Sequence, residues 1–407
     1  MNEERRLTTR QAAELLGVKP ATVYAYVSRG QLTSRRDPVG RGSSFDAREV
    51  EELARRSRRE AAAPAGELAV RTALTLIEPD RYYFRGVDAV ELASRYAFEE
   101  VAEWLWTGTL PPGRRFTAPP EPLAAARRAV AALPEHSGPV DRLRVAVAAA
   151  AVADPLRFDL SEKAVLGSAR CLIPTLVGAL PVLGPAPWAG DGRTARQLWA
   201  RLTEREPDPD ALAVLDLALG LLVDHDLAAS TLAVRVAASA RAHPYAAVSA
   251  GLGALEGPLH GAAGRLAHRM LVEVLERGGA APVVAEYLRA GRRVPGLGHR
   301  LYRGEDPRAG ALFGRLEDLA QAGPALAAAR EVSAVMARQG GLHANVDLAL
   351  AVLTVSCGME AEAGETVFAV ARTAGWVAHA LEEYQERPLR MRPSGEYHGP
   401  RPPQPMP

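Results

Sequence analysis

Residues 294–309 read VPGLGHRLYRGEDPRA, and they place His299, Arg300, Arg303 and Arg308 beside a turn that is rich in glycine. Histidine is rare in this chain, at nine of 407 residues, so its position next to glycine and arginine is informative. Glycine lets a backbone approach a ligand closely, and the planar guanidinium of arginine binds carboxylates in a bidentate manner. The pattern favours a site for an acidic ligand, although Arg308 taken alone can equally pair with a surface carboxylate.

Three further clusters combine histidine, aspartate and glycine. The run VDHDLAAST carries His225 in an expected helix, and GPLHGAA holds His260 among glycines. The run NVDLA carries Asp347 near an expected helix start, which Asn345 can cap. Each residue has an ordinary structural explanation when taken alone, such as a histidine in the core or an aspartate at a helix terminus. No HxxxH or CxxC pair supplies ligands at local spacing, so the sequence predicts no metal site.

The sequence around these clusters is dominated by Ala, Leu and Arg, with apolar residues at helical spacing. Proline and glycine interrupt these segments near 111–113, 134–139, 181–193, 206–209, 257–258 and 295–298. Alternating, strand-like patterns are scarce. A mostly α fold is therefore expected beyond the first 66 residues.

Composition excludes several classes of protein. With 48% hydrophobic and 24% charged residues, the chain can form a large core. No apolar stretch of about 18 residues occurs and the charged N-terminus lacks the apolar core of a signal peptide, so a cytoplasmic protein with no membrane association is expected. The net charge of +1 excludes a globally basic nucleic-acid binder. Cys171 and Cys357 stand alone in apolar surroundings and are expected to pack in the core.

Taken in order, the clusters form a series that resembles the citrate synthase family. The series runs through HDLAAST, GPLHG, GLGHRLYRGEDPR, NVD, ARTAGW and RPSGEYHG, and the upstream stretch YYFRGVDAVELASRYAFEEVAEWLWTGTLP is also similar to the family. Six motifs in the same order are far more specific than any one of them. The resemblance covers roughly residues 68–399 and implies a citrate synthase fold with two helical domains. The expected boundaries are 67–258 and 350–400 for the large domain, 259–349 for the small domain and 401–407 for a tail.

The resemblance implies an acyltransferase that condenses acetyl-CoA with oxaloacetate and hydrolyses citryl-CoA to citrate and CoA. This chemistry removes a weakly acidic proton beside a thioester, so it needs a general base, an electrophile for the enolate oxygen and a polarised ketone. By resemblance, Asp347 is the base and His260 donates a hydrogen bond to the thioester carbonyl. His299 polarises the ketone of oxaloacetate.

Oxaloacetate also carries two carboxylates, which planar guanidinium groups bind well. By resemblance, Arg308, Arg372 and Arg392 bind these carboxylates, and His225 adds a further contact. The family supplies the arginine at the position of Arg392 from the neighbouring subunit, which implies a homodimer. The resemblance implies no metal and no prosthetic group, because the CoA thioester is itself a substrate.

The chain departs from the family pattern near the predicted site. Asp226 and Ala228 stand where the family usually has Glu and Asn, and Gly264 replaces another usual Asn. Leu348 and Ala349 follow the NVD motif, where an aromatic residue is more common, so a different shape of the acyl pocket is expected. A 2-methylcitrate synthase that uses propionyl-CoA is therefore an alternative, since one methylene is worth only about 1–3 kcal/mol of discrimination.

Residues 1–60 form a separate basic unit, with 13 Lys and Arg against 9 Asp and Glu. The sequence predicts a helix capped by Thr9, a second helix that opens at Pro20, two short strands around a turn, and a third helix capped by Asp46. This order of elements is typical of a winged helix-turn-helix. A linker is expected over 61–66.

This unit resembles the winged helix-turn-helix domains of excisionases and mercury regulators. In a DNA-binding interpretation, the second helix enters the major groove and arginines contact phosphates. The candidates are Thr22 and Tyr24 on that helix, flanked by Ala21 and Ala25, and Arg29, Arg35 and Arg41 for the phosphates. The alternative is a dimerisation or regulatory appendage.

A different class of function also fits the order of the domains. A DNA-binding regulator would use the part that resembles citrate synthase to sense oxaloacetate or acyl-CoA without converting them. Such a sensor needs the carboxylate-binding arginines but no general base. The presence of Asp347 together with His260 and His299 therefore favours the enzyme.

Overall fold

The computed structural model describes residues 6–16, 18–28, 32–36, 43–51, 53, 70–185, 192–257, 260–393, 398–400 and 404. Contacts between residues divide the chain into two units, Met1–Arg71 and Thr72–Pro407. The division falls just beyond the expected linker at 61–66, which itself lies outside the described residues.

The N-terminal unit combines short helices with a three-stranded antiparallel sheet. Its elements are β1 (Arg6–Thr8), α1 (Thr9–Leu16), α2 (Pro20–Ser28), β2 (Ser34–Arg36) and β3 (Ser43–Asp46), followed by helical residues 47–51 and 53. The strand order is β1-β3-β2, with Leu7 opposite Phe45. The sequence predicted the pair β2 and β3 but not β1. Val23 and Phe45 are both 0% exposed, so this unit has a core of its own.

Polar side chains cap the helices of this unit. As predicted, α2 begins at Pro20, and Asp46 Oδ1 accepts the backbone N–H of the residue two positions later at 2.8 Å. The predicted cap at Thr9 is wrong by one position, because Thr9 is already helical. Thr8 is the capping residue: its N–H donates to Gln11 Oε1 at 2.9 Å, and its hydroxyl accepts the N–H of Gln11 at 3.4 Å. Thr8 and Gln11 thus form a capping box.

The C-terminal unit begins with a small sheet that the sequence analysis missed. The strands β4 (Thr75–Ile77), β5 (Tyr82–Phe84) and β6 (Val87–Asp88) pair antiparallel in the order β4-β5-β6. Arg85 and Gly86 join β5 to β6 and both have positive φ, as two-residue hairpin turns require. Strands of two or three residues are too short to show an alternating pattern, which explains why they were missed.

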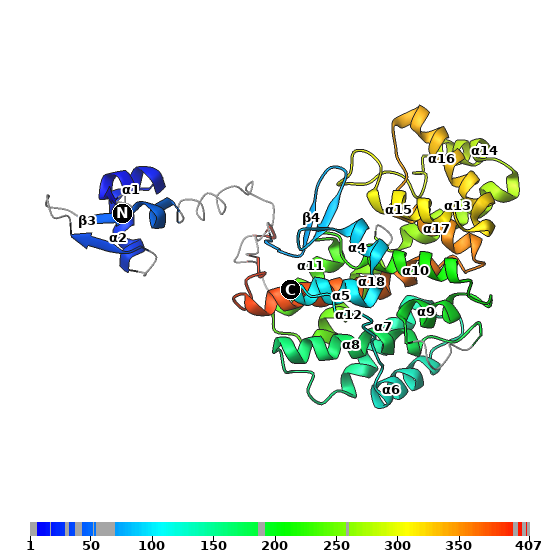
Figure 1. Cartoon of the computed structure of the whole chain (residues 1–407), viewed down its shortest axis with the longest axis horizontal. Coiled ribbons are helices and arrows are strands. Elements are labelled where there is room, and N and C mark those ends of the chain that lie inside the picture. The colour runs from blue at the N-terminus through cyan, green and yellow to red at the C-terminus, as the bar shows by residue number, and fades with distance from the viewer. Residues whose placement is uncertain are drawn as a thin grey trace. The chain divides into compact units, whose positions relative to one another are not determined.

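The remainder of the C-terminal unit is helical, as predicted (Figure 1). Its helices are α4 (Ala89–Arg95), α5 (Phe98–Thr107), α6 (Pro120–Ala131), α7 (Pro139–Val152), α8 (Glu162–Ala179), α9 (Thr194–Leu202), α10 (Pro209–Leu222), α11 (Ala229–Ser239), α12 (Pro244–Leu255), α13 (Ala262–Arg277), α14 (Ala280–Arg289), α15 (Pro307–Leu316), η1 (Ala320–Ala322), α16 (Gly323–Gly340), α17 (Val346–Ser356) and α18 (Ala363–Gln385). The described residues of each break that the proline and glycine pattern predicted lie between two of these helices or at the first residue of the second helix. Four of the described helices after such breaks begin with proline at their first position or one residue later.

Helix α18 runs through the middle of this unit. It contacts α5, α8, α10, α11 and α12, and Trp376 on it is 0% exposed. A helix that is buried on nearly all sides is expected in the core of a large domain. This central position matters for function, because residues of α18 reach the interior from which a site can be built.

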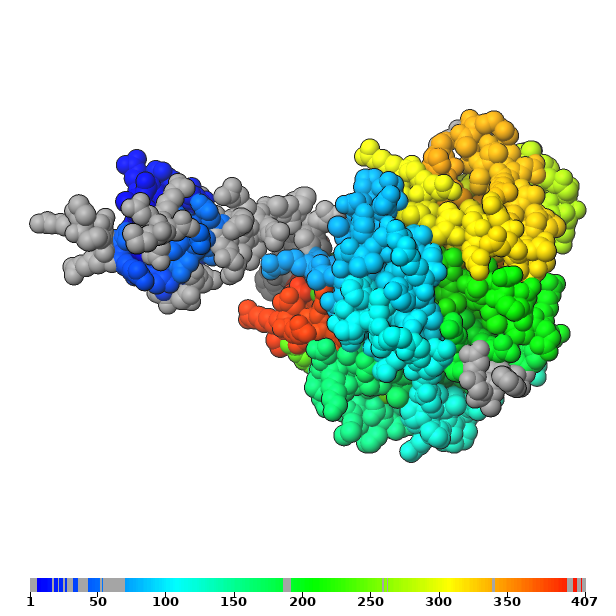
Figure 2. All heavy atoms as spheres, in the orientation of Figure 1, coloured from blue at the N-terminus to red at the C-terminus, as the bar shows by residue number. Residues whose placement is uncertain are grey.

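Helices α13 to α17 form a second group, and Figure 2 shows its yellow and orange segments gathered at one end of this unit. Within the group, α17 packs against α13, α15 and α16. Contacts of α15 with α10 and of α13 with α18 join the group to the rest. The group covers most of the expected small domain, 259–349. The expected boundary after residue 349 falls inside α17 and stays a prediction.

No helix among the described residues is long and apolar enough to cross a membrane. Both cysteines are free thiols. Cys357 is buried in the core as predicted, whereas Cys171 is only half-buried.

Candidate active site

A cavity of about 190 Å³ in the C-terminal unit brings together six of the seven residues predicted to bind substrate or catalyse. The loop between α10 and α11, the turn before α13, the segment before α15, and helices α15, α17 and α18 supply one residue each. In that order they are His225, His260, His299, Arg308, Asp347 and Arg372. Segments that lie far apart in the sequence therefore meet at one place.

Asp347 lies in the first turn of α17, next to the residue that caps this helix. Asn345 Oδ1 accepts the backbone N–H of Asp347 at 3.0 Å, so Asn345 is the cap, as predicted. The Asp347 carboxylate is therefore not needed as the cap and lines the cavity instead. Burial raises the pKa of Asp347 to about 6, against the opposing charge of Arg308. A carboxyl group with a pKa closer to neutrality is a better general base than an ordinary aspartate.

His260 faces the cavity from the turn that precedes α13. Its Nε2 lies 2.8 Å from the hydroxyl of Ser230, which also accepts the indole N–H of Trp376 at 3.3 Å. Because the Ser230 oxygen already accepts from Trp376, its own proton can go to Nε2, and the neutral ring then carries its proton on Nδ1. Burial lowers the pKa of His260 to about 4, and the charge of Arg372 adds to this shift. His260 is therefore a neutral hydrogen-bond donor at physiological pH.

His299 has the opposite arrangement of its ring nitrogens. Its Nδ1 accepts the backbone N–H of Leu301 at 3.1 Å, which places the proton of the neutral ring on Nε2. Nε2 lies 3.3 Å from Nη2 of Arg308, and because both groups are donors in this tautomer, the contact is a close approach and not a hydrogen bond. Burial, together with the charge of Arg308, lowers the pKa of His299 to about 4. An N–H donor and a guanidinium thus lie side by side at the cavity.

Arg308 is held by the residue that caps its own helix. Its Nε and Nη2 donate to the two carboxylate oxygens of Asp306 at 3.0 and 2.8 Å. Asp306 also accepts the backbone N–H of Val346 at 3.1 Å, which ties the start of α15 to the start of α17. The alternative of a surface ion pair is wrong, because Asp306 is 1% exposed and Arg308 is 3% exposed. The pair fixes the position of Arg308 at the cavity.

Arg372 supplies a second buried guanidinium from α18. Its Nε donates to the carbonyl of Leu222 at 2.9 Å, and its guanidinium carbon lies 4.4 Å from the centre of the Phe368 ring. Burial lowers the pKa of Arg372 to about 10, so the side chain stays charged at neutral pH. Arg308 and Arg372 together match a ligand with two carboxylates.

The expectation that His225 lies in a helix is wrong. His225 lies in the loop between α10 and α11, where Asp226 has a φ of 57° that no helix allows. The preceding residue, Asp224, is fully buried and lies 3.2 Å from Nε2 of His379 on α18. This long-range contact holds the chain away from a helical path. Burial lowers the pKa of His225 well below its usual value.

Sequence reasoning passed over several residues that position the site. Ser230 contacts His260, and the hydroxyl of Tyr302 lies 2.8 Å from Nε2 of His225. Asp306 holds Arg308 in place. All three residues lie inside the motifs quoted above. The contacts of Ser230 and Tyr302 join residues 30 and 77 positions apart in sequence, so only the tertiary structure reveals them.

Arg392, the seventh predicted residue, lies outside this cavity. It is exposed in the turn that follows α18, and its backbone N–H donates to the carbonyl of Leu389 at 3.1 Å. Within one chain, then, Arg392 does not line the cavity. Its predicted action across a dimer interface stays a prediction.

The DNA-binding candidates lie on the N-terminal unit. Thr22 is half-buried, Arg35 is exposed, and Tyr24 is 48% exposed with its hydroxyl 3.2 Å from that of a threonine on α1. Arg29 and Arg41 lie outside the described residues. These positions place Tyr24 on the open face of α2.

Two of the five departures from the family pattern reach the cavity, and Asp226 is not among them. Ala228 and Gly264 line it, whereas Leu348 and Ala349 are 0% exposed in the core. Leu348 and Ala349 were expected to shape the acyl pocket, but neither residue lines the cavity. The cavity wall therefore differs from the family pattern at Ala228 and Gly264, where the usual polar side chains are absent.

The sequence predicted no metal site. Within the described part of the chain, no group of three or more His, Cys, Asp or Glu lies close enough together to hold a metal ion.

Comparison with protein families supports what the geometry suggests. The family model described as "Citrate synthase, C-terminal domain" matches residues 63–394, and a "Helix-turn-helix domain" model matches residues 6–58. A citrate synthase of Acidithiobacillus ferridurans is 32% identical over 78% of this chain and 89% of its own length. A 2-methylcitrate synthase of Mycobacterium tuberculosis is 28% identical over 82% of this chain and 89% of its own.

Solved structures have the same fold. The citrate synthase of Pyrobaculum aerophilum superposes with a TM-score of 0.70 at 27% identity, over 92% of this chain and 97% of its own. That of Thermotoga maritima gives 0.66 at 26% identity, over 84% and 96%. The helical fold, the family match and a cavity lined by a buried carboxylate, two histidines and two guanidiniums define a condensing acyltransferase. This chain belongs to the citrate synthase family.

Proposed function

We propose that the protein condenses acetyl-CoA with oxaloacetate and hydrolyses the resulting citryl-CoA to citrate and CoA. The observation that carries this proposal is the single cavity lined by Asp347, His260, His299 and two buried arginines. The family match supports an enzyme of this type, and the relatives include both citrate and 2-methylcitrate synthases.

In the first step, the Asp347 carboxylate removes a proton from the methyl group beside the thioester. The electron pair of that C–H bond moves toward the thioester oxygen, which accepts a hydrogen bond from Nδ1–H of His260. A neutral histidine can fill this role, because its ring still carries one N–H that donates to the thioester oxygen. The lowered pKa of His260 and the raised pKa of Asp347 support these two roles.

In the second step, the enolate carbon attacks the ketone carbon of oxaloacetate. Nε2–H of His299 donates to the ketone oxygen as it becomes an alkoxide, and the charge of Arg308 stabilises the same region. Arg308 and Arg372 bind the two carboxylates, with His225 as a further contact. The alkoxide takes up one proton and Asp347 gives one up, which completes citryl-CoA. Water then attacks the thioester carbon, the C–S bond breaks, and the sulfur takes a proton from the water as CoA leaves.

Assembly and closure complete this proposal. The groups at the cavity come from both expected domains, so closing residues 259–349 over the acyl-CoA would exclude bulk water before the proton is removed. In a homodimer, Arg392 of each chain reaches the site of its partner and adds a third guanidinium.

The alternative is a 2-methylcitrate synthase that uses propionyl-CoA. The small residues Ala228 and Gly264 at the cavity wall favour space for the extra methylene. A steady-state assay of CoA release from oxaloacetate tests both candidates, with acetyl-CoA and propionyl-CoA measured in parallel. A higher kcat/KM for acetyl-CoA supports the citrate synthase, and the reverse order supports the alternative. Absence of CoA release with either substrate would support the metabolite sensor.

The N-terminal unit is proposed to bind DNA through α2 and its arginines. The helix-turn-helix match at residues 6–58 and the excess of basic residues in this unit support the proposal. Binding to a random duplex should weaken steeply as salt is added, because phosphate contacts release counterions. A fluorescence anisotropy titration at two salt concentrations measures this, and no binding at low salt would favour a regulatory appendage.

A further inference from the structure

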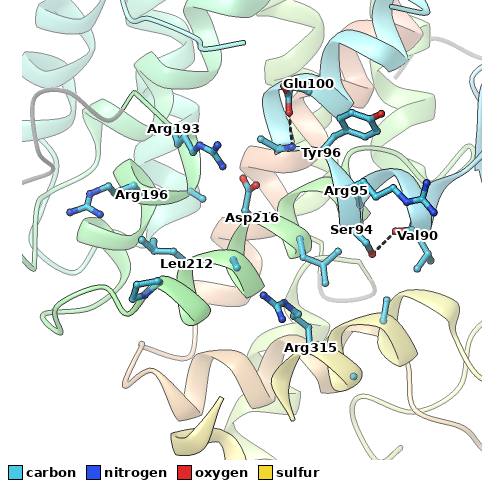
Figure 3. A pocket seen from close by; sticks show the side chains of 18 residues that line it. Val90, Ser94, Arg95, Tyr96, Glu100, Arg193, Arg196, Leu212, Asp216 and Arg315 are labelled. Carbon is cyan, nitrogen blue, oxygen red and sulfur yellow. Dashed lines mark hydrogen bonds between the residues drawn. The ribbon is translucent and has the colours of Figure 1, made fainter. Parts of the chain in front are cut away.

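A second cavity, of about 690 Å³, lies apart from the catalytic one and shares no lining residue with it. It lies between the turn that joins α4 to α5, the start of α9, helix α10 and the C-terminal half of α15 (Figure 3). Cavities of about 300–1,000 Å³ accommodate small organic ligands. Nothing in the proposed reaction uses this space.

Positive charge gathers around this cavity from α4, α9 and α15. Its basic and acidic lining residues are four arginines and two acids: Arg95, Arg193, Arg196, Arg315, Glu100 and Asp216. Glu100 is already engaged, because its carboxylate oxygens accept the backbone N–H groups of Ala97 and Gly113 at 2.9 and 2.8 Å. The guanidiniums thus outnumber the carboxylates that face them.

Asp216 lies at the centre of the lining. Figure 3 shows its carboxyl group between Arg193 and Tyr96, with the guanidinium of Arg315 pointing toward it from α15. Burial raises the pKa of Asp216 to about 7; Glu99 and Glu100 add to the rise, while Arg193 opposes it. Partial protonation near neutral pH increases the excess of positive charge. A protonated carboxyl group can also donate a hydrogen bond to a bound anion.

Arg315 and Arg95 form exposed ion pairs. Arg315 lies 2.9 Å from Asp318 and 3.9 Å from Asp210, and Arg95 lies 3.2 Å from Glu91. Solvent-exposed ion pairs of this kind contribute little to stability. A ligand with several negative charges can therefore replace them without a large cost to the fold.

We propose that this cavity binds a small anion with two or more carboxylate or phosphate groups, and that the anion acts as an effector of the enzyme. Helix α15 connects the two cavities, because Arg315 lies seven residues after Arg308, about 10 Å along the helix. An anion held between Arg315 and Arg193 in the second cavity holds α15 in the position in which Arg308 lines the catalytic cavity together with Asp347. It therefore lowers the KM for oxaloacetate with little change in kcat.

Isothermal titration calorimetry of the full chain tests the binding, with inorganic pyrophosphate and tricarballylate as separate probes for phosphate and carboxylate ligands. We expect at least one probe to bind at one site per chain. The variant Arg193→Gln with Arg315→Gln should weaken that binding at least about tenfold, because two charge-assisted contacts are lost. Both residues are exposed, so the fold should be retained.

A second variant leaves all four arginines in place. A side chain at Gly314 would enter open space at the cavity, so Gly314→Glu should abolish binding by adding a carboxylate. The matched control is Gly310→Glu, one turn earlier on α15, where a side chain also meets open space but does not line this cavity. This control should bind the probe as the wild type does. No binding of either probe, or binding that Gly314→Glu leaves unchanged, would overturn the proposed site.

The effector role rests on the proposed citrate synthase function, whereas the binding does not. The KM for oxaloacetate should fall when the bound probe is present in the wild type and should not respond in Gly314→Glu. A KM that is unchanged or raised in the wild type overturns the effector role and leaves the anion site standing. If no turnover is detected, the proposed function fails, and calorimetry still decides whether the site exists.

Discussion

At the scale of single residues, the proton on each catalytic candidate depends on one neighbour. Leu301 donates to Nδ1 of His299, and Ser230 stands beside Nε2 of His260. The two neutral histidines therefore present different nitrogens to the cavity as donors. For Asp347, in contrast, burial is the main cause that raises the pKa, and a higher pKa makes the carboxylate a stronger base.

The substitution Asp347→Asn removes the general base and retains the shape of the side chain. We expect kcat to fall by about 10²–10⁴-fold, the usual contribution of a general base, while oxaloacetate binds nearly as before. Steady-state kinetics and calorimetric titration with oxaloacetate measure the two effects. Asp80→Asn, at an exposed position, is the matched control and should be fully active. A variant of Asp347 within about twofold of the wild type would show that its carboxylate only supports the helix.

The dependence of activity on pH should report the ionisation of Asp347. The base works only when it is ionised, so kcat/KM should rise with pH and level off above a midpoint of about 6. The pKa values of His260 and His299 are lowered to about 4, so both rings stay neutral between pH 5 and 8. Their ionisation therefore does not change the activity in this range. A pH–rate profile between pH 5 and 8 checks this. A profile that is already flat at pH 5 would contradict the assignment of the base.

At the scale of elements, the close approach of α18 to the loop that carries His225 depends on a glycine. A Cβ atom at Gly375 would overlap the carbonyl oxygen of Val223 and lie 3.0 Å from Oδ1 of Asp224. The same loop places His225 at the cavity. The glycine of the ARTAGW motif is therefore explained by packing between α18 and the loop.

The substitution Gly375→Ala should destabilise the protein by at least about 1–3 kcal/mol, as overpacking of a core does. The midpoint of urea denaturation measures this loss of stability. The matched control is Gly253→Ala on α12, where a Cβ atom meets no other group and alanine should stabilise the helix by up to about 1 kcal/mol. Equal midpoints for the two variants would show that the loop moves aside for the extra methyl group.

At the scale of the whole molecule, the N-terminal unit and the catalytic unit should be separable. Deletion of residues 1–62 removes most of the first unit and no residue of the catalytic cavity, and the citrate synthase match begins at residue 63. We expect a folded protein with unchanged kcat and KM. Circular dichroism and the CoA-release assay check fold and activity. A soluble but inactive product would show that the first unit contributes to the catalytic assembly.

Exchange of residues between subunits gives a second prediction at this scale. Arg392→Ala and His260→Ala should each give an inactive homodimer, since each removes one group from both sites. A mixed dimer should regain one complete site, formed by the intact His260 of one chain and the intact Arg392 of the other. Co-refolded, purified mixed dimers should therefore be far more active than the sum of the two parents. Inactive mixed dimers of folded chains would refute the shared site.

The sequence by itself determined the helical class, several helix ends and six of the residues that line one cavity. Helix ends depend on local chemistry, as at Pro20, Asp46 and Asn345, and such chemistry can be read from neighbouring residues. The motif series identified six residues that line one cavity because each motif carries its residue types with it.

The tertiary structure alone decided features that depend on distant partners. His225 leaves the helical path because buried Asp224 contacts His379, which is 155 residues away. Arg308 is an interior group because its partner Asp306 is buried, and the strand β1 exists because β3 folds back onto it. Burial and long-range pairing have no local signal, since they depend on which surfaces meet when the helices pack. The same reason explains why no single motif brings together the four arginines of the cavity beside α15.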